Sequence, residues 1–218
     1  FEKAKKSQAK GDLEPMQVFY NTRLAKVWDS AQEQTKADVL RDRARLESYG
    51  LGSMPDGVLM LTASVDTQAN RLELMVMGWG AGMERWVVDF QVISGDPADE
   101  RTWAALDELL KARYRHPCGA ELMIMATAVD SGGNHTDEVY QFCRMRRWRS
   151  VFAIKGASKR GRPVIAQRPS MVDVTWKGLT ERHGGELWIV GTDTAKDWIY
   201  NRYVFDTGPG ALHFANDL

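Results

Sequence analysis

The chain has 218 residues, which is enough for one domain of generous size with a buried core. Lys and Arg total 29 and Asp and Glu total 29, so overall charge gives no sign of nucleic-acid binding, and any such contact needs a local basic patch. The two cysteines, Cys118 and Cys143, exclude a disulfide framework and a four-ligand zinc site, and we expect reduced thiols in an intracellular protein. No stretch is apolar enough to span a bilayer, and residues 1–10 lack the apolar core of a signal peptide, so no membrane association is expected.

The first fifty residues have a helical composition. Residues 38–49 are charged and are followed by Gly50, a plausible end for a helix. The chain does not begin with Met. We therefore expect residues 1–52 to be a helical linker from an upstream domain, and residues 53–218 to form the main domain.

Three strands are predicted next. Residues 57–65 form a nearly continuous apolar run, typical of a central strand buried on both faces. Residues 71–79 and 85–93 alternate apolar and polar side chains. The segments 67–70 and 80–82 are suited to hairpin turns. The domain should therefore open with three antiparallel strands.

The rest of the chain alternates helices and strands. The expected elements are a helix at 97–114, a strand at 121–129, a helix at 136–147, a strand at 151–154, a basic loop at 155–168, strands near 171–176 and 186–190, and a helix at 194–203. The first helix should start near Asp96 or Asp99, and the second should be capped at Asn134 or Thr136. This order predicts an α/β fold, with a ribonuclease-H-like mixed sheet and helices on both faces.

Two aspartates follow directly on apolar strands. Asp66 ends the run at 57–65, and Asp130 ends the strand at 121–129 and precedes Ser131-Gly132-Gly133. Either residue alone could simply begin a turn. If the two strands are neighbours, however, both carboxylates reach one metal-sized space, and the glycines allow a phosphate or metal to approach the backbone. Hard oxygen ligands select Mg²⁺ or Mn²⁺, and two such ions suit phosphodiester cleavage.

Glu73 is a third candidate. It lies seven residues after Asp66 and, by strand alternation, on the opposite face from Leu72 and Leu74. It could be a metal ligand or an acceptor that orients water. Alternatively it is an exposed strand residue paired with Arg71 or Arg85.

A basic loop is the clearest local charge asymmetry. It carries five cations with no acid between the first and the last: Lys155, Lys159, Arg160, Arg162 and Arg168. Flexible basic loops beside a nuclease site commonly hold phosphates, so we favour DNA contact over a merely solvated loop. A second basic cluster, Arg144, Arg146, Arg147 and Arg149, is ambiguous because helix C-termini favour cations in any case.

Other motifs point to no chemistry. The four histidines show no metal-ligand spacing, although His135 is close enough to Asp130 in sequence to touch a site there. Gly78-Trp-Gly-Ala-Gly82 lies in a predicted hairpin and opens no helix, which excludes a dinucleotide loop. No Gly-x-x-x-x-Gly-Lys-Ser/Thr phosphate loop is present, so these residues should not bind ATP by themselves.

Eight short segments match one family in the same order. They are Leu61-Thr-Ala-Ser-Val-Asp66-Thr-Gln, Arg71-Leu-Glu73, Gly78-Trp-Gly80, Asp130-Ser-Gly-Gly133, Ile154-Lys-Gly-Ala-Ser158, Gly191-Thr-Asp-Thr-Ala-Lys196, Tyr200-Asn-Arg202 and Gly210-Ala-Leu-His-Phe214. Together they resemble the nuclease domain of the lambda-type terminase large subunit family. Phe19-Tyr-Asn-Thr22 resembles the segment by which that family leaves its ATPase domain. The resemblance runs from about Val18 to the end of the chain.

The resemblance implies a ribonuclease-H-like, metal-dependent endonuclease that cuts concatemeric double-stranded phage DNA in the cytoplasm of the infected bacterial host. By motif position, Asp66 and Asp130 carry over as metal ligands for Mg²⁺ or Mn²⁺, with two ions in the complete site, and Glu73 as an active-site acid. The implied partners are the upstream ATPase domain of the same polypeptide, the terminase small subunit and the portal. The family's late acid belongs to an Asn-Glu-x-x-Asp helix, which we expect beyond Leu218; Asp217 is a poor substitute.

The sequence therefore predicts a divalent-metal-dependent DNA endonuclease. The alternative is a non-catalytic module of the packaging motor that grips DNA or docks on the portal. Metal-dependent nicking of plasmid DNA separates the two.

Overall fold

Alternation of apolar and polar residues builds the sheet that organises residues 37–218, the part of the chain described by this computed structural model. Strands β1 (Met60–Thr67), β2 (Arg71–Trp79) and β3 (Arg85–Ser94) pair antiparallel in chain order. In β2 every second side chain is buried, which fixes one face of the sheet as the core side. The three predicted antiparallel strands are thus confirmed. The helical composition expected before residue 37 lies outside the described residues.

The second half of the sheet is mainly parallel. Strand β5 (Glu121–Asp130) pairs with β1, β6 (Val151–Gly156) pairs with β5, and β8 (Leu179–Val190) pairs with β6, all in parallel. β7 (Ser170–Trp176) closes that edge antiparallel to β8, and β9 (Leu212–His213) adds to β3 at the other edge. The order is β7-β8-β6-β5-β1-β2-β3-β9. This is the mixed α/β sheet expected for a ribonuclease-H-like fold.

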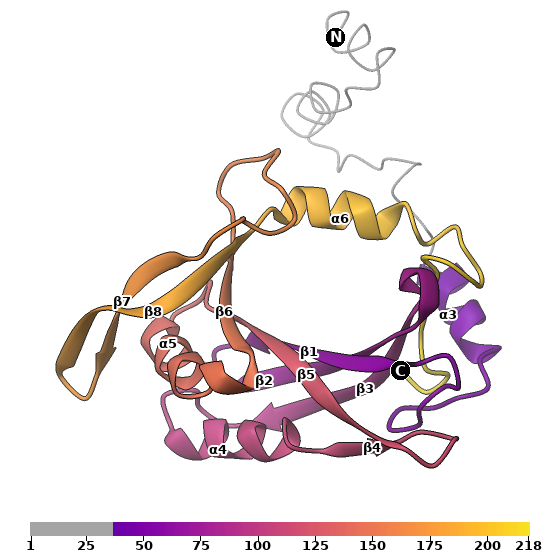
Figure 1. The fold of residues 1–218 in the computed structure, drawn as a ribbon, viewed down its shortest axis with the longest axis horizontal. Coiled ribbons are helices and arrows are strands. Elements are labelled where there is room, and N and C mark those ends of the chain that lie inside the picture. The colour runs from indigo at the N-terminus through magenta and orange to yellow at the C-terminus, as the bar shows by residue number, and fades with distance from the viewer. Residues whose placement is uncertain (1–36) are drawn as a thin grey trace, which may run out of the picture. The chain divides into compact units, whose positions relative to one another are not determined.

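The helices divide between the two sides of the sheet (Figure 1). α4 (Glu100–Leu109) and α5 (Thr136–Met145) share the core side, where Trp103 and Phe142 pack with ring centroids 4.9 Å apart. α6 (Thr192–Tyr200) lies on the other side. Among the described helices, none covers the sheet face below α6 as closely as α4 and α5 cover the core face.

Asp107 ties α4 to the end of α5. Its carboxylate accepts hydrogen bonds from Arg146 and Arg149 at 2.5 and 2.7 Å and pairs with Lys111 at 2.9 Å. Burial opposes ionisation of Asp107, but the three cationic donors outweigh burial and hold its pKa well below the ordinary range. Arg149 belongs to the 3₁₀ turn η2 (Arg147–Arg149) that leads into β6.

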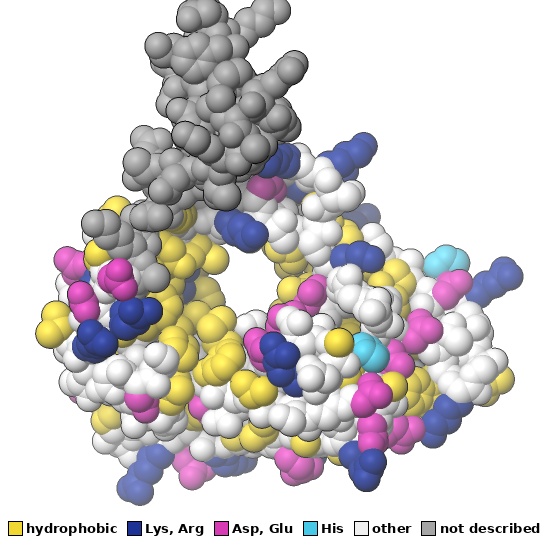
Figure 2. Space-filling view, turned by 180° about the vertical axis from the view of Figure 1, so that it is seen from behind, with side chains coloured by type: hydrophobic (Ala, Val, Ile, Leu, Met, Phe, Trp, Pro, Cys, Tyr) yellow, Lys and Arg dark blue, Asp and Glu magenta, His cyan; other side chains and the backbone are white. Residues whose placement is uncertain are grey.

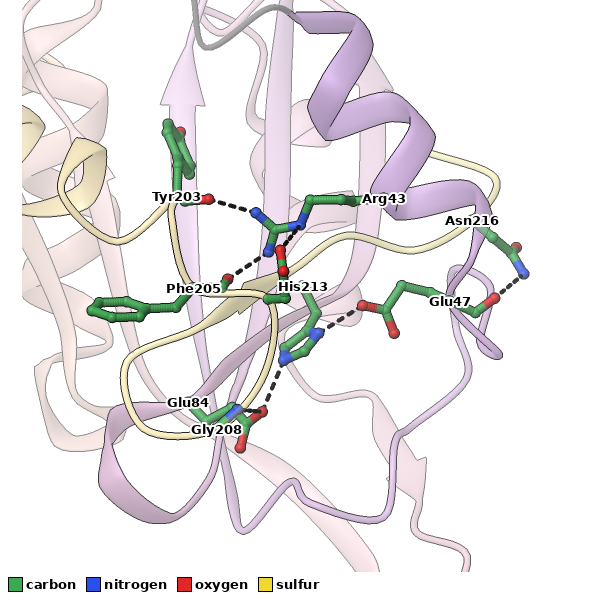
Figure 3. Close-up of polar contacts among 9 residues, drawn as sticks. Arg43, Glu47, Glu84, Tyr203, Phe205, Gly208, His213 and Asn216 are labelled. Atoms are coloured by element: carbon green, nitrogen blue, oxygen red, sulfur yellow. Dashed lines mark hydrogen bonds and ion pairs between the residues drawn. The ribbon is translucent and has the colours of Figure 1, made fainter.

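A second polar cluster joins α3 (Ala37–Arg45) and the turn after it to the C-terminal segment (Figure 3). Arg43 donates to the carbonyl oxygens of Tyr203 and Phe205. The buried His213 ring bridges Glu47 at 2.6 Å and Glu84 at 2.9 Å and stacks on Trp86. This cluster holds the short strand β9 beside β3.

Several element boundaries differ from the predictions. β1 covers Met60–Thr67, not 57–65, and only its alternate side chains are buried, not both faces; β8 covers Leu179–Val190, not 186–190. The helix expected at 97–114 ends at Leu109, and Arg113–Arg115 form the short strand β4, which pairs antiparallel with the start of β5. A turn containing Gly119, whose φ is +90°, makes that hairpin possible. α5 starts after His135, not after Asn134 or Thr136, and α3 ends at Arg45, well before Gly50.

The predicted start of α4 is confirmed. Asp99 is the N-cap of α4, and its side chain accepts from the Arg101 N–H at 2.9 Å. Among the described residues no helix is long and apolar enough to cross a membrane.

The edge strand β7 carries an irregularity. Its pairing with β8 shifts register between Val172 and Val174, and Asp173 accepts from the His183 N–H at 2.9 Å at that point. A side chain thus replaces a regular backbone contact, as in a β-bulge.

Candidate active site

Asp66 and Asp130 come together at neighbouring strand ends. β1 and β5 run parallel with Val65 paired to Val129, and each aspartate is the next residue along its strand. Both valines are buried on the core side, so alternation places both carboxylates on the opposite, open face. Adjacent strands lie about 4.8 Å apart, which brings the two residues side by side. The Thr67 hydroxyl donates to the Asp130 carbonyl at 3.0 Å and ties the two strand ends together.

Local contacts orient the two carboxylates. The Gln68 amide donates to Oδ2 of Asp66, and the Gly132 N–H donates to Oδ1 of Asp130 at 3.1 Å. Within the described residues no hydrogen bond occupies the second oxygen of either carboxylate. A Cβ at Gly132 would lie 3.3 Å from both oxygens of Asp130, so glycine leaves that carboxylate open to a ligand.

Glu73 lies on the same open face. It pairs directly with Asp66 in the β1–β2 register, while Leu72 and Leu74 point into the core, as predicted. Its carboxylate is engaged by Arg71, with Nε to Oε1 at 2.7 Å. Across residues 37–218, no three His, Cys, Asp or Glu side chains are grouped closely enough to hold a metal ion. The donor set at the strand ends is therefore a pair of carboxylates, with Glu73 nearby but held by Arg71.

Two carboxylates with free oxygens are suitable ligands for Mg²⁺ or Mn²⁺. Both ions prefer oxygen ligands, and Mg²⁺ usually keeps several waters while binding one or two carboxylates. The pair is thus adequate for one ion. A second ion would need a further acid, such as Glu73 released from Arg71.

The basic loop begins beside this pair. Asp130 pairs with Ile154 in β6, and Lys155 is the next residue. All five predicted cations of the loop are exposed, and a groove runs along it between Lys155, Lys159, Arg162 and Ser170. Among the described residues, no acid pairs with Lys155, Lys159, Arg162 or Arg168. The loop thus presents cationic groups to solvent near the acidic pair.

The loop is docked on the start of α6. The Gly161 N–H donates to Asp193 at 2.7 Å, and the Thr194 hydroxyl donates to the Arg162 carbonyl at 2.6 Å. The hydrogen bond from Gly161 is the main cause that lowers the pKa of Asp193. A Cβ at Gly191 would meet the Arg162 carbonyl oxygen at 2.3 Å, so only glycine allows this close approach. Beneath α6 an opening is visible, bordered largely by hydrophobic side chains (Figure 2).

The second basic cluster has another role. Arg144 pairs with Glu181, Arg147 pairs with Glu186 at 2.6 Å, and Arg146 and Arg149 share Asp107. These cations are neutralised within the fold and tie α5 and η2 to the β7–β8 hairpin and α4. The sequence left the role of this cluster open, and these ion pairs indicate a structural role.

Two further residues considered in the sequence analysis, Gly78 and Asp217, have structural roles. Gly78 lies inside β2 and is required by packing, because a Cβ there would lie 2.7 Å from Val58. Asp217 accepts from the Leu51 N–H at 2.7 Å.

The sequence analysis did not identify Thr67 and Gln68 as part of the site, although both directly follow Asp66 in the motif. Short polar side chains next to a strand-end aspartate are the signal that could have identified them.

Comparisons with known proteins agree on one family. A family model described as the terminase large subunit gpA endonuclease domain matches residues 1–218. The chain is 37% identical over 216 residues to the terminase large subunit of Escherichia phage lambda, covering 96% of this chain and 32% of that protein. It is 35% identical over 199 residues to that of Enterobacteria phage P21, covering 91% and 29%. The chain thus spans about a third of the length of these curated relatives, and no solved structure matches it.

Proposed function

The chain belongs to the endonuclease-domain family of terminase large subunits, and from this premise we propose that it is a divalent-metal-dependent endonuclease that hydrolyses phosphodiester bonds of concatemeric double-stranded DNA during phage packaging. The observation that carries the proposal is the side-by-side placement of Asp66 and Asp130 at two parallel strand ends on the open face of the sheet. A rigid sheet holds such a pair more accurately than a loop does.

Asp66 and Asp130 would hold Mg²⁺ or Mn²⁺ through their open oxygens, with Gln68 and the Gly132 N–H fixing the orientation of the two carboxylates. When bound, the metal supplies Lewis acidity and neutralises charge at the scissile phosphate. Glu73, once released by Arg71, supplies either a further ligand or an acceptor that orients the attacking water. Its direct pairing with Asp66 supports either role.

The basic loop would hold the DNA backbone beside the acidic pair. Lys155, Lys159, Arg160, Arg162 and Arg168 are exposed, and the loop backbone is fixed to α6, so its cations are presented at a defined place. Lys and Arg contacts to phosphates give affinity without sequence preference. Such contacts suit an enzyme that must hold a duplex while one bond is cut.

The wider assignment follows from the family. We propose that residues 1–52 link residues 53–218 to an upstream ATPase domain of the same polypeptide, and that the whole protein works with the terminase small subunit and the portal in the cytoplasm of the infected bacterial host. A non-catalytic module that grips DNA or docks on the portal is the alternative.

Plasmid nicking tests the proposal. Asp66→Asn and Asp130→Asn should each reduce Mn²⁺-dependent nicking by at least about a hundredfold, the effect of removing one group that stabilises the transition state. Thermal stability should be unchanged or raised, because crowded carboxylates repel. Asp42→Asn, which removes an exposed carboxylate that pairs with Arg45 in α3, is the control and should nick normally. Wild-type nicking by either strand-end variant would refute the site. Metal-independent DNA binding with no nicking by the full-length wild-type protein would favour the gripping module.

A further inference from the structure

Arg85 is a buried cation without an acidic partner among the described residues. It starts β3, is only 4% exposed, and donates through Nη2 to the Gly210 carbonyl at 3.0 Å. Its Nε is buried and makes no hydrogen bond within residues 37–218. A buried, incompletely bonded charge is costly unless another group compensates it.

A second guanidinium lies next to it. Arg85 and Arg202 both stack on the Trp198 ring of α6, at 4.5 and 3.6 Å from its centroid. Gly210 lies close to both cations, because its carbonyl binds Arg85 and a Cβ on it would lie 3.6 Å from Nε of Arg202. Burial and the nearby charge of Arg202 lower the pKa of Arg85. Two like charges thus converge on one ring.

The nearby carboxylates are engaged elsewhere. Glu84 accepts from His213 and from the Gly208 N–H (Figure 3), and Asp206 pairs with Arg43. Within residues 37–218, neither Arg85 nor Arg202 forms an ion pair. Attraction to aromatic rings compensates part of the charge, but it supplies no acceptor for the buried N–H.

Arg85 belongs to the same face of the sheet as the acidic pair, and Arg202 lies beside it over Trp198. Trp79 pairs with Arg85, belongs to the set of β2 side chains that includes Glu73, and donates to Thr62 of β1. Trp79 lies six positions after Glu73 in β2, which corresponds to about 20 Å along the strand. One DNA duplex, with a rise of about 3.4 Å per base pair, reaches both places within about six base pairs.

We propose that Arg85 and Arg202, stacked on Trp198, bind a backbone phosphate of the DNA at a second contact point across the open face from Asp66 and Asp130. The identity of the ligand as DNA rests on the proposed nuclease function. Two planar guanidinium groups suit the geometry of phosphate oxygens. The opposing interpretation is that the stack only fastens α6 to β3.

The direct test needs no variant. The ¹⁵N–¹H signals of the arginine Nε groups are followed in two titrations at constant ionic strength. One adds inorganic phosphate, and the other adds a short DNA duplex with EDTA present to prevent cleavage. The Arg85 and Arg202 signals should shift with both, at millimolar phosphate and at micromolar duplex. No shift with either would leave the stack as a fastening only. A shift with phosphate but not with duplex would overturn the assignment to DNA.

A variant supplies the second measurement. Arg202→Gln should flatten the salt dependence of duplex binding by about 0.9 log unit, as expected when the protein neutralises one phosphate fewer. Arg101→Gln, the same charge change at a highly exposed residue of α4 paired with Asp99, should leave that slope unchanged. An Arg202→Gln slope equal to wild type would refute the phosphate contact. Because Asp66→Asn nicking is measured separately, that result would leave the nuclease proposal standing.

Discussion

At the scale of single residues, Arg71 holds the carboxylate of Glu73 in an ion pair. The two side chains form an ion pair that is 41% and 26% exposed, and pairs of this kind are worth up to about 1 kcal/mol. If Glu73 joins the metal site, Arg71→Gln should strengthen Mn²⁺ binding by about two- to fivefold, as measured by calorimetry. Arg71→Lys keeps the charge and is the control. Unchanged affinity in Arg71→Gln would show that Glu73 only forms a surface ion pair.

Asp107 is a residue whose charge matters for folding. Its depressed pKa means that it stabilises the native state fully above the unfolded value of about 3.9, and that this contribution is lost as pH falls through the lower folded value. Asp107→Asn should therefore lower the free energy of unfolding by about 2–3 kcal/mol at pH 7, since its hydrogen bonds join charged groups. Urea denaturation at pH 7 and pH 3 measures this. The difference from wild type should shrink at pH 3, and an equal difference at both pH values would contradict the assignment.

At the scale of elements, the basic loop and the second basic cluster should behave differently. Replacing Lys159, Arg160 and Arg162 together by Gln should weaken duplex binding about equally for all sequences, because in the proposed complex these cations contact phosphates. The salt slope should flatten by about 0.9 log unit for each phosphate that the variant no longer neutralises. The control is Arg144→Gln with Arg147→Gln, which removes two cations already neutralised by Glu181 and Glu186. An unchanged slope in the loop variant would mean that the loop is merely solvated.

Elements were predictable where one periodicity dominated. β2 alternates cleanly, and its predicted bounds equal the observed Arg71–Trp79. β4 was missed because Arg-Tyr-Arg is too short to show a period, and only its pairing with β5 makes it a strand. β9 was missed for the same reason, since two residues join β3 through the tertiary contacts of His213.

At the scale of the whole molecule, the candidate site depends on strand order. The sequence placed Asp66 and Asp130 at strand ends, but it predicted their proximity only on the condition that the strands are neighbours, and the β1–β5 pairing meets that condition. The capture of Glu73 by Arg71 was one of two alternatives that the sequence left open. The Arg85–Trp198 contact joins residues more than a hundred positions apart, and no local pattern indicates it. What sequence periodicity cannot supply is the long-range pairing of side chains.

The bulged edge of β7 bears on how copies of this protein behave together. The chain has no net charge and a sequence pI of about 7.1, so repulsion between copies is weak near neutral pH. Among the described strands β7 lies at an edge of the sheet, and exposed edges are templates for self-association unless a bulge or a charge interrupts them. Asp173 lies at the bulge and also carries a negative charge. Asp173→Val should therefore increase aggregation during refolding relative to wild type, as measured by light scattering. Asp173→Asn keeps an acceptor for the His183 N–H, so it should aggregate less than Asp173→Val. Equal scattering by the two variants and wild type would mean that another feature keeps the molecules apart.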